Sequence, residues 1–352
     1  MRVLYFLLVL VPVAFALEFT HANEIAIFGV SALALIPLAA VLGRATEEVA
    51  IYTGPKIGAL LNATLGNAAE LIITLVALRE GLINVVKASI AGSIIGNILI
   101  VLGASLLLGG LRNGIQRFDR HTAGVNSNMM ALAVVSLVVP AVFALGSADI
   151  RPTPEKTQLI SDGLAIVLII VYILYVFYTL RGQPGDPGTP PAPEHHESPS
   201  MKLPMALGIL AAATLMIVFM SEFLVGAIEP TAEKLHLSDL FIGVMLVPLV
   251  GNVAEHLVAV QVALQNKMDL SLGIAIGSSL QVALFVAPIL VLAGVVMGQP
   301  MDLVFNGYEI GAMVGATFIA VLISLDGESN WLEGVQLIAL YVMLGIAFFF
   351  VG

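Results

Sequence analysis

Long apolar runs follow one another along almost the whole chain, separated by short stretches that contain charged residues, proline or glycine. A helix needs about 20 apolar residues to cross the hydrocarbon layer of a bilayer. Eleven runs are of about this length, at Val3–Phe19, Glu24–Leu42, Pro55–Leu78, Val85–Leu111, Val125–Leu145, Ser161–Leu180, Leu203–Ile228, Asp239–Gln265, Leu270–Met297, Phe305–Leu325 and Glu333–Val351. The pattern predicts an all-α polytopic membrane protein with 11 transmembrane helices.

The composition agrees with this prediction and excludes several other classes of protein. The chain is 59% hydrophobic and only 11% charged, and its mean hydropathy is +1.03, which is far from the composition of a soluble protein. It contains no cysteine, so disulfides and thiolate metal sites are excluded. The net charge of −10 comes without a basic patch, which argues against a nucleic-acid partner.

The distribution of lysine and arginine predicts the orientation in the membrane. If the N-terminus lies inside, the inner segments carry nine of these residues and the outer segments carry five. The sequence therefore predicts a cytoplasmic N-terminus and an outer C-terminus. Arg2, the first apolar run and the sequence Ala-Phe-Ala at 14–16 also resemble a signal peptide. We interpret the run as a first transmembrane helix, because the charge distribution is consistent with it.

The segment from Gly182 to Ser200 is rich in proline, glycine and polar residues and is the one clear linker. Residues after it match residues before it at a constant offset of 185 positions, which relates span three to span eight and span four to span nine. Matching spans are five apart, an odd number, so the halves should enter the membrane from opposite sides, as inverted repeats do in many secondary transporters. We expect a first helix in 1–22, a five-helix repeat in 23–181, a cytoplasmic linker in 182–202 and a second five-helix repeat in 203–352.

Each half carries the same short motif inside an apolar span. Residues 66–70 read Gly-Asn-Ala-Ala-Glu, and residues 251–255 read Gly-Asn-Val-Ala-Glu, 185 positions later (255 − 70). An ionisable side chain is costly inside a bilayer and marks a functional site by default. The Asn and Glu of each motif share a helix face, and the Gly permits local unwinding. The predicted cation and proton site comprises Gly66, Asn67, Glu70, Gly251, Asn252 and Glu255, with Glu70 and Glu255 as the metal ligands.

The residue types of the motif indicate which ions it binds. Carboxylate, amide and carbonyl oxygens suit Ca²⁺, which takes six to eight oxygen ligands, whereas Mg²⁺ tends to keep its waters. Two carboxylates balance one divalent cation, and without it two like charges in a low-dielectric site do not both stay ionised, so protons bind. The pair therefore predicts exchange of one divalent cation for about two protons. The alternative is that each glutamate makes a structural hydrogen bond between helices.

Polar residues around the motifs form a predicted secondary site. It comprises Ser93, Asn97, Ser278, Gln281 and His256. The first four suit coordination or a path for water and ions, and each equally suits a hydrogen bond between helices. His256 directly follows the second glutamate, where it fits a proton relay or a modulator of that residue; the alternative is a buried histidine paired with a neighbouring helix.

Other acidic residues support weaker predictions. Glu47 and Glu48 are expected after the second span, on the inner side, where the alternative to a functional role is that they cap or solvate a helix end. The cluster Glu-His-His-Glu at 194–197 either senses Ca²⁺ or pH or is part of a solvated tether.

The stretches around the repeated motif also carry a family resemblance. Residues 60–72, Leu-Leu-Asn-Ala-Thr-Leu-Gly-Asn-Ala-Ala-Glu-Leu-Ile, resemble the first signature of the calcium/proton exchanger (CAX) family of the cation/calcium antiporter superfamily. Residues 251–256, Gly-Asn-Val-Ala-Glu-His, resemble the second signature, and residues 45–48, 92–94 and 277–281 are also similar. The resemblance runs from about Leu42 to the C-terminus. It implies a sodium/calcium-exchanger-like fold in which Glu70 and Glu255 bind Ca²⁺ and H⁺ alternately.

Motif and resemblance together predict a secondary active transporter and not an enzyme. We expect a Ca²⁺/H⁺ antiporter that exports cytosolic Ca²⁺ by alternating access, with Ca²⁺ and H⁺ as substrates, no cofactor and the lipid bilayer as surroundings. The alternative is a Na⁺-coupled exchanger, or one of broader specificity for Mn²⁺, Na⁺ and K⁺, with the same fold. The compact length favours a prokaryotic cell membrane over a vacuolar membrane, and the sequence leaves homo-oligomerisation open.

Overall fold

Most of the described chain is helical. The computed structural model describes residues 5–144, 152–181 and 199–351, so most of the predicted linker, with the cluster at 194–197, and also Arg2 lie outside the described residues. The helices before the linker are η1 (Leu7–Val9), α2 (Leu10–Phe19), α3 (Glu24–Thr53), α4 (Pro55–Leu65), α5 (Ala68–Arg79), α6 (Ile83–Gly96), η2 (Asn97–Leu102), α7 (Gly103–Asn113), α8 (Arg120–Ala144) and α9 (Pro154–Arg181).

The helices after the linker follow a similar order. They are α10 (Leu203–Gly226), α11 (Ile228–Leu235), α12 (Asp239–Phe241), η3 (Ile242–Leu246), α13 (Val247–Gly251), α14 (Val253–Leu264), α15 (Met268–Gln281), η4 (Val282–Val286), α16 (Ala287–Met297), α17 (Gly307–Ile323) and α18 (Trp331–Val351). One small antiparallel pair, β1 (Gln116–Arg117) with β2 (Glu328–Ser329), joins the segments that precede α8 and α18.

Seven of the described helical segments are long and apolar enough to cross a membrane, and the bent pair from Asp239 to Leu264 makes up to eight. Two shorter apolar helices, at Leu7–Phe19 and Gly307–Ile323, add to them. The segment formed by α6, η2 and α7 is the most enclosed of these: 72% of its most apolar 18-residue stretch is buried inside the protein, whereas 17% of the corresponding stretch of α9 is buried. The fold therefore places α6 at its centre and leaves α9 at the periphery, where apolar side chains face outward.

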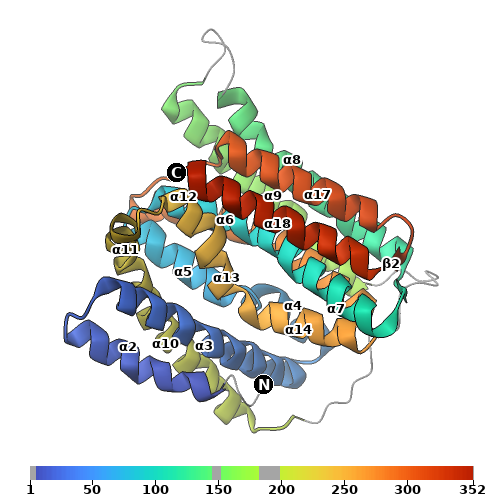
Figure 1. Cartoon of the computed structure of the whole chain (residues 1–352), viewed down its shortest axis with the longest axis horizontal. Helices are drawn as coiled ribbons and strands as arrows, with labels where there is room; N and C mark the ends of the chain where they lie inside the picture. The colour runs from blue at the N-terminus through green and yellow to red at the C-terminus, as the bar shows by residue number, and fades with distance from the viewer. Residues whose placement is uncertain (1–4, 145–151, 182–198, 352) are drawn as a thin grey trace.

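The arrangement in space follows from this difference in burial. Helices α2, α3 and α10 lie together along one side of the molecule, while α6 passes through the middle beside α5 and α13 (Figure 1). The ring of Phe15 in α2 packs edge-on against those of Phe219 and Phe223 in α10, with centroids 5.5 and 5.1 Å apart. The first apolar run is thus a helix packed against the rest of the fold.

The two halves repeat each other in the helices that follow the motifs. Helices α5 and α14 both have 12 residues, and α6 and α15 both have 14. The turn between them uses a left-handed residue in both halves, Gly81 with φ 80° and Asn266 with φ 60°. The π-helical turns η2 and η4 begin at Asn97 and Val282, again 185 residues apart. The sequence offset therefore corresponds to a repeat in local structure.

Both motifs lie where a helix breaks. Asn67 separates α4 from α5 with φ −94° and ψ 20°, and Asn252 separates α13 from α14 with φ −108° and ψ 5°. The second break bends the chain by 61°. Each predicted span is therefore two helices in sequence, and the break falls beside the glycine that was expected to permit unwinding.

The predicted end of the second span at Leu42 is wrong. Helix α3 continues to Thr53, since the stretch after Leu42 contains good helix formers such as Arg44, Ala45 and Glu47 and no proline, and the helix ends at Gly54, which has φ 82°. Glu48 consequently lies inside the helix and not after it. It is buried and accepts hydrogen bonds from the backbone amides of Ser200 and Met201, at 2.9 and 3.3 Å.

Candidate functional site

The two motif glutamates occupy equivalent positions at the start of two helices. Glu70 lies in the first turn of α5 and Glu255 in the first turn of α14, directly after the breaks at Asn67 and Asn252. The first turn of a helix presents unpaired amide groups and a partial positive charge, which favours a carboxylate there. Each break thus gives its glutamate a polar backbone environment within an apolar span.

The two motifs meet crosswise. A Cβ atom on Gly66 would lie 3.7 Å from Gln281 Oε1 and 3.9 Å from Glu255 Oε1, and one on Gly251 would lie 3.7 Å from Glu70 Cβ. The glycine of each motif therefore faces the glutamate of the other motif. A larger side chain at either glycine would project toward the opposite carboxylate.

Polar groups from α6 and α15 support the glutamates. Ser93 Oγ donates a hydrogen bond to Glu70 Oε1, and the Ser278 side chain interacts with Glu255. Asn67 Nδ2 donates to Gln281 Oε1 at 2.5 Å, which joins the first half to the second. Three residues of the predicted secondary site are thus in contact with the primary one.

Three buried oxygens around this site have no protein partner among the described residues. They are Asn67 Oδ1, Glu70 Oε2 and Glu255 Oε2. A buried polar atom without a partner is unfavourable unless water, a proton or an ion satisfies it. All three are hard oxygen donors of the kind that bind Ca²⁺. Within the described chain no group of three or more His, Cys, Asp or Glu residues forms a metal site, so amide, hydroxyl and backbone oxygens would complete the coordination here.

Two predicted residues do not join this arrangement directly. Asn97 is buried at the start of η2, and its Nδ2 atom has no hydrogen-bond partner in the described part of the chain. His256 is half-buried and makes no hydrogen bond or ion pair with any described residue. Asn252 is buried at the second break. The alternative interpretation, in which His256 forms a hydrogen bond with a neighbouring helix, has no such bond among the described residues, and the role of His256 as a proton relay or a modulator of Glu255 stays a prediction.

The site is closed on one side by a tight helix contact. A Cβ on Gly92 of α6 would lie 2.1 Å from the carbonyl oxygen of Val244, and a Cβ on Gly243 would lie 2.4 Å from Ala88 Cβ. Distances this short mean that α6 and η3 touch backbone to backbone at these glycines, and we call this contact the α6–η3 seam. The sequence showed Gly92 as part of a matched pair of motifs but gave no sign of its partner in η3.

The equivalent contact in the other half is open. Gly277 of α15 is the counterpart of Gly92, and among the described residues no atom lies within 4 Å of where its Cβ would be. Gly58 of α4 is the counterpart of Gly243, and its Cβ would meet Ala50 of α3 and not α15. Gly66, which faces Glu255, is exposed. The glycine contact beside the site is thus tight along α6 and loose along α15, and α4 is exposed at Gly66.

Comparison with known proteins places this architecture in a family. The family described as sodium/calcium exchanger protein matches residues 23–181 and 205–350. The chain is 46% identical to a Ca²⁺/H⁺ antiporter of Aphanothece halophytica, over 98% of this chain and 95% of the relative, and 42% identical to the Ca²⁺/H⁺ antiporter ChaA of Bacillus subtilis, over 99% of each. The solved structure of native YfkE superposes with a TM-score of 0.86 at 38% identity and covers 99% of both chains. The chain belongs to the sodium/calcium exchanger protein family, whose members are ion transporters and not enzymes.

Proposed function

We propose that this protein is a Ca²⁺/H⁺ antiporter in which Glu70 and Glu255 bind one Ca²⁺ ion or protons by turns. The observation that carries the proposal is that two glutamates at two helix breaks each face the glycine of the other motif, and that each has one carboxylate oxygen without a partner among the described residues. The relatives from A. halophytica and B. subtilis bear the name Ca²⁺/H⁺ antiporter, which supports the same activity.

The chemistry of the exchange follows from charge balance. Two ionised carboxylates and one Ca²⁺ ion make a neutral unit, and so do two protonated carboxyl groups. Two bare carboxylates would repel each other in a site of low dielectric constant, so the empty site is disfavoured. The protein therefore changes its access side most readily when either Ca²⁺ or protons occupy the site, and this preference couples the two fluxes.

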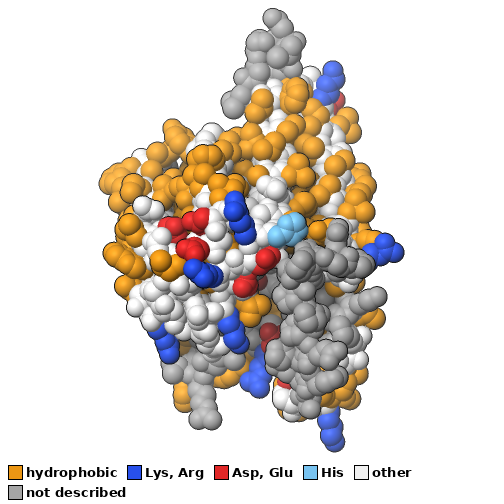
Figure 2. All heavy atoms as spheres, turned by 90° about the vertical axis from the view of Figure 1, so that its right-hand side faces the viewer, with side chains coloured by type: hydrophobic (Ala, Val, Ile, Leu, Met, Phe, Trp, Pro, Cys, Tyr) orange, Lys and Arg blue, Asp and Glu red, His pale blue; other side chains and the backbone are white. Residues whose placement is uncertain are grey.

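We propose eleven membrane crossings, formed by a first helix and two inverted five-helix repeats. Contacts between distant segments support this topology, because each joins two segments predicted on the same side. On the predicted outer side these are Lys87 with Asp302, Arg79 with Glu222 and Lys234 with Glu24; on the predicted inner side they are Arg117 with Glu328, Asp119 with Asp269 and Ser200 with Glu48. Figure 2 shows charged side chains gathered on the end of the molecule where β2 lies, flanked by hydrophobic ones.

We further propose that the N-terminus is cytoplasmic and that the membrane is a prokaryotic cell membrane. With this orientation the open side of the site, along α4, faces the cytosol, and the sealed α6–η3 seam faces outward. The structure then corresponds to the state that receives cytosolic Ca²⁺.

Proton release from sealed vesicles tests the proposed activity. Proteoliposomes that contain the purified protein, a trapped pH indicator and an acidic interior are given Ca²⁺ outside. Internal alkalinisation that accompanies Ca²⁺ uptake is the expected result, because protons leave as Ca²⁺ enters. Flux that follows a Na⁺ gradient and ignores the pH gradient would instead assign a Na⁺-coupled exchanger.

Two substitutions test the site within the same assay. Glu70→Gln and Glu255→Gln should each reduce the proton signal to background, because one carboxylate cannot balance a divalent cation. Glu222→Gln is the matched control, since Glu222 pairs with Arg79 at the protein surface, at 3.2 Å, and should leave exchange unchanged. Ca²⁺/H⁺ exchange that survives in either site variant would overturn the assignment of these glutamates.

A further inference from the structure

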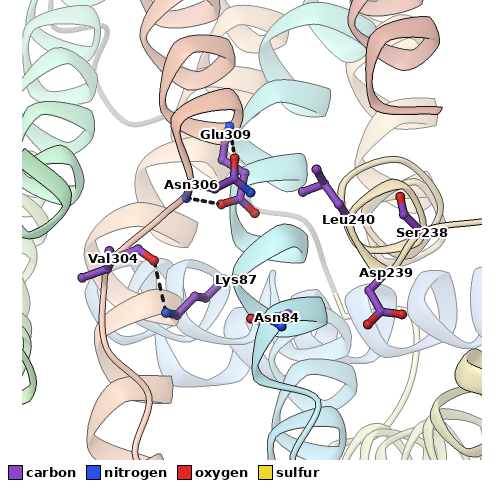
Figure 3. A pocket seen from close by; sticks show the side chains of 8 residues that line it. All are labelled: Asn84, Lys87, Ser238, Asp239, Leu240, Val304, Asn306 and Glu309. Carbon is purple, nitrogen blue, oxygen red and sulfur yellow. Dashed lines mark hydrogen bonds between the residues drawn. The ribbon is translucent and has the colours of Figure 1, made fainter. Parts of the chain in front are cut away.

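A pocket of about 390 Å³ opens at the start of α6, on the sealed side of the ion site. Its lining comes from three parts of the fold: Asn84 and Lys87 of α6, Ser238, Asp239 and Leu240 at the start of α12, and Val304, Asn306 and Glu309 at the start of α17 (Figure 3). This pocket has no part in the site described above. Its charged lining residues come from three different helices.

Lys87 is held firmly at the wall of this pocket. Its Nζ atom forms an ion pair with Asp302 and donates a hydrogen bond to the carbonyl oxygen of Val304 at 3.1 Å. Its side chain is only 14% exposed, and Glu309 lies within electrostatic range of it. A lysine this enclosed near the end of an apolar helix is costly, and such residues in membrane proteins commonly line an ion pathway.

The position of Lys87 relates it to the ion site. Six residues separate Lys87 from Ser93, which corresponds to about 9 Å along the axis of α6. Ser93 donates to Glu70, so the same helix carries the pocket at one end and the ion site further along. Between them lies the α6–η3 seam, formed by Gly92 and Gly243. Separation of η3 from α6 would join the pocket to the site.

The second half of the chain has no charged residue at the position equivalent to Lys87. The residue that corresponds to Lys87 in the second half, 185 positions later, is Leu272, which is buried in α15. The open side of the ion site therefore has an apolar residue where the sealed side has an ammonium group. The repeat in backbone structure does not require this difference.

We propose that the positive charge of Lys87, at the outer end of the ion pathway, acts as an electrostatic valve: it weakens the binding of external Ca²⁺ to the site. This charge thereby favours release of exported Ca²⁺. The inference rests on the proposed function. If the axial rise of about 9 Å between Lys87 and Ser93 sets the scale of the separation, a unit charge in water changes the binding of a divalent ion by about fivefold, by Coulomb's law. Replacement of Lys87 by a neutral residue leaves Asp302 in place, so the pocket becomes more negative by one full charge.

The test compares the KM for Ca²⁺ from the two sides, in right-side-out and inside-out membrane vesicles. Lys87→Met should lower the KM for external Ca²⁺ about fivefold and leave the KM for cytoplasmic Ca²⁺ unchanged. Lys87→Arg keeps the charge and should behave as the wild type. Lys234→Gln is the matched control, because Lys234 pairs with Glu24 in an exposed ion pair on the same predicted side.

A double variant separates charge from ion-pair loss. Lys87→Met with Asp302→Asn restores the net charge of the pocket but not the ion pair, so an electrostatic valve predicts that the external KM returns to the wild-type value. A KM that stays altered in the double variant, or that shifts equally on both sides in Lys87→Met, would overturn the proposal. Absence of Ca²⁺-driven proton release in the wild type would instead contradict the proposed function.

Discussion

Replacement of Gly92 by alanine should shift the protein away from the state seen in this structure. The added Cβ would lie 2.1 Å from the carbonyl oxygen of Val244, well inside the distance at which two such atoms touch. The contact is backbone, so no side-chain rotation relieves it, and α6 must separate from η3. Overpacking of this kind costs about 1–3 kcal/mol, which changes a two-state population by about 5- to 150-fold.

Gly277→Ala is the matched variant, because Gly277 is the counterpart of Gly92 in the second half. No described atom lies within 4 Å of its Cβ position, so the substitution costs little in the present state. If the two halves exchange roles during transport, Gly277 takes part in the tight contact of the opposite state. Gly277→Ala should therefore favour the state seen here, and the two variants should shift the equilibrium in opposite directions.

Labelling of a single cysteine measures the shift. The chain contains no cysteine, so Asn62→Cys introduces the only thiol. Asn62 is exposed and lies one helical turn before Gly66, on the face of α4 that looks toward Glu255. The rate of reaction with a water-soluble maleimide should fall in Gly92→Ala and be equal to or above that of the parent in Gly277→Ala.

Two outcomes would refute this reasoning. One is an unchanged labelling rate in Gly92→Ala when the protein remains monodisperse and still transports Ca²⁺. The other is an equal fall in both glycine variants, which would show that the α6–η3 seam does not distinguish the two access states.

Three further predictions follow from the packing and the site. Gln281→Leu removes the acceptor of the Asn67 amide and should raise the KM for Ca²⁺ about fivefold, as expected for one hydrogen bond of about 1 kcal/mol; an unchanged KM in the vesicle assay would contradict this role. Gly334→Ala should destabilise the fold by about 1–3 kcal/mol and lower the melting temperature in detergent, because its Cβ would lie 2.3 Å from the backbone nitrogen of Leu107; Gly163→Ala, with no described atom within 4 Å, is the control that should not lower it. Acidification on the Ca²⁺ side should raise the KM for Ca²⁺ by up to about tenfold per pH unit for each proton that competes, whereas a pH-independent KM would argue against a shared site.

Several features of the site could be predicted from the sequence because they depend on local chemistry. A carboxylate inside an apolar run is conspicuous, and the offset of 185 between Glu70 and Glu255 shows that the motif occurs twice. The hydrophobic pattern predicted the helices, including the two short apolar ones at Leu7–Phe19 and Gly307–Ile323. It placed the end of α3 wrongly, since charged residues after Leu42 continue a helix as readily as they end one.

Other features depend on which segments meet, and no pattern along the chain contains that information. Three contacts at the site join residues more than 100 positions apart in the sequence. They are the approach of Gly66 to Glu255, the hydrogen bond between Asn67 and Gln281 and the contact of Gly92 with Val244. The repeat in sequence also gave no sign that one seam is closed and the other open, because equivalent residues take part in both. The sequence by itself determined the membrane helices, the repeat and the two carboxylates. The tertiary structure decided that the two motifs converge, that α6 packs tightly against η3 while the equivalent glycine of α15 has no close neighbour among the described residues, and that Lys87 lines a pocket with α12 and α17, because packing between distant helices sets these distances.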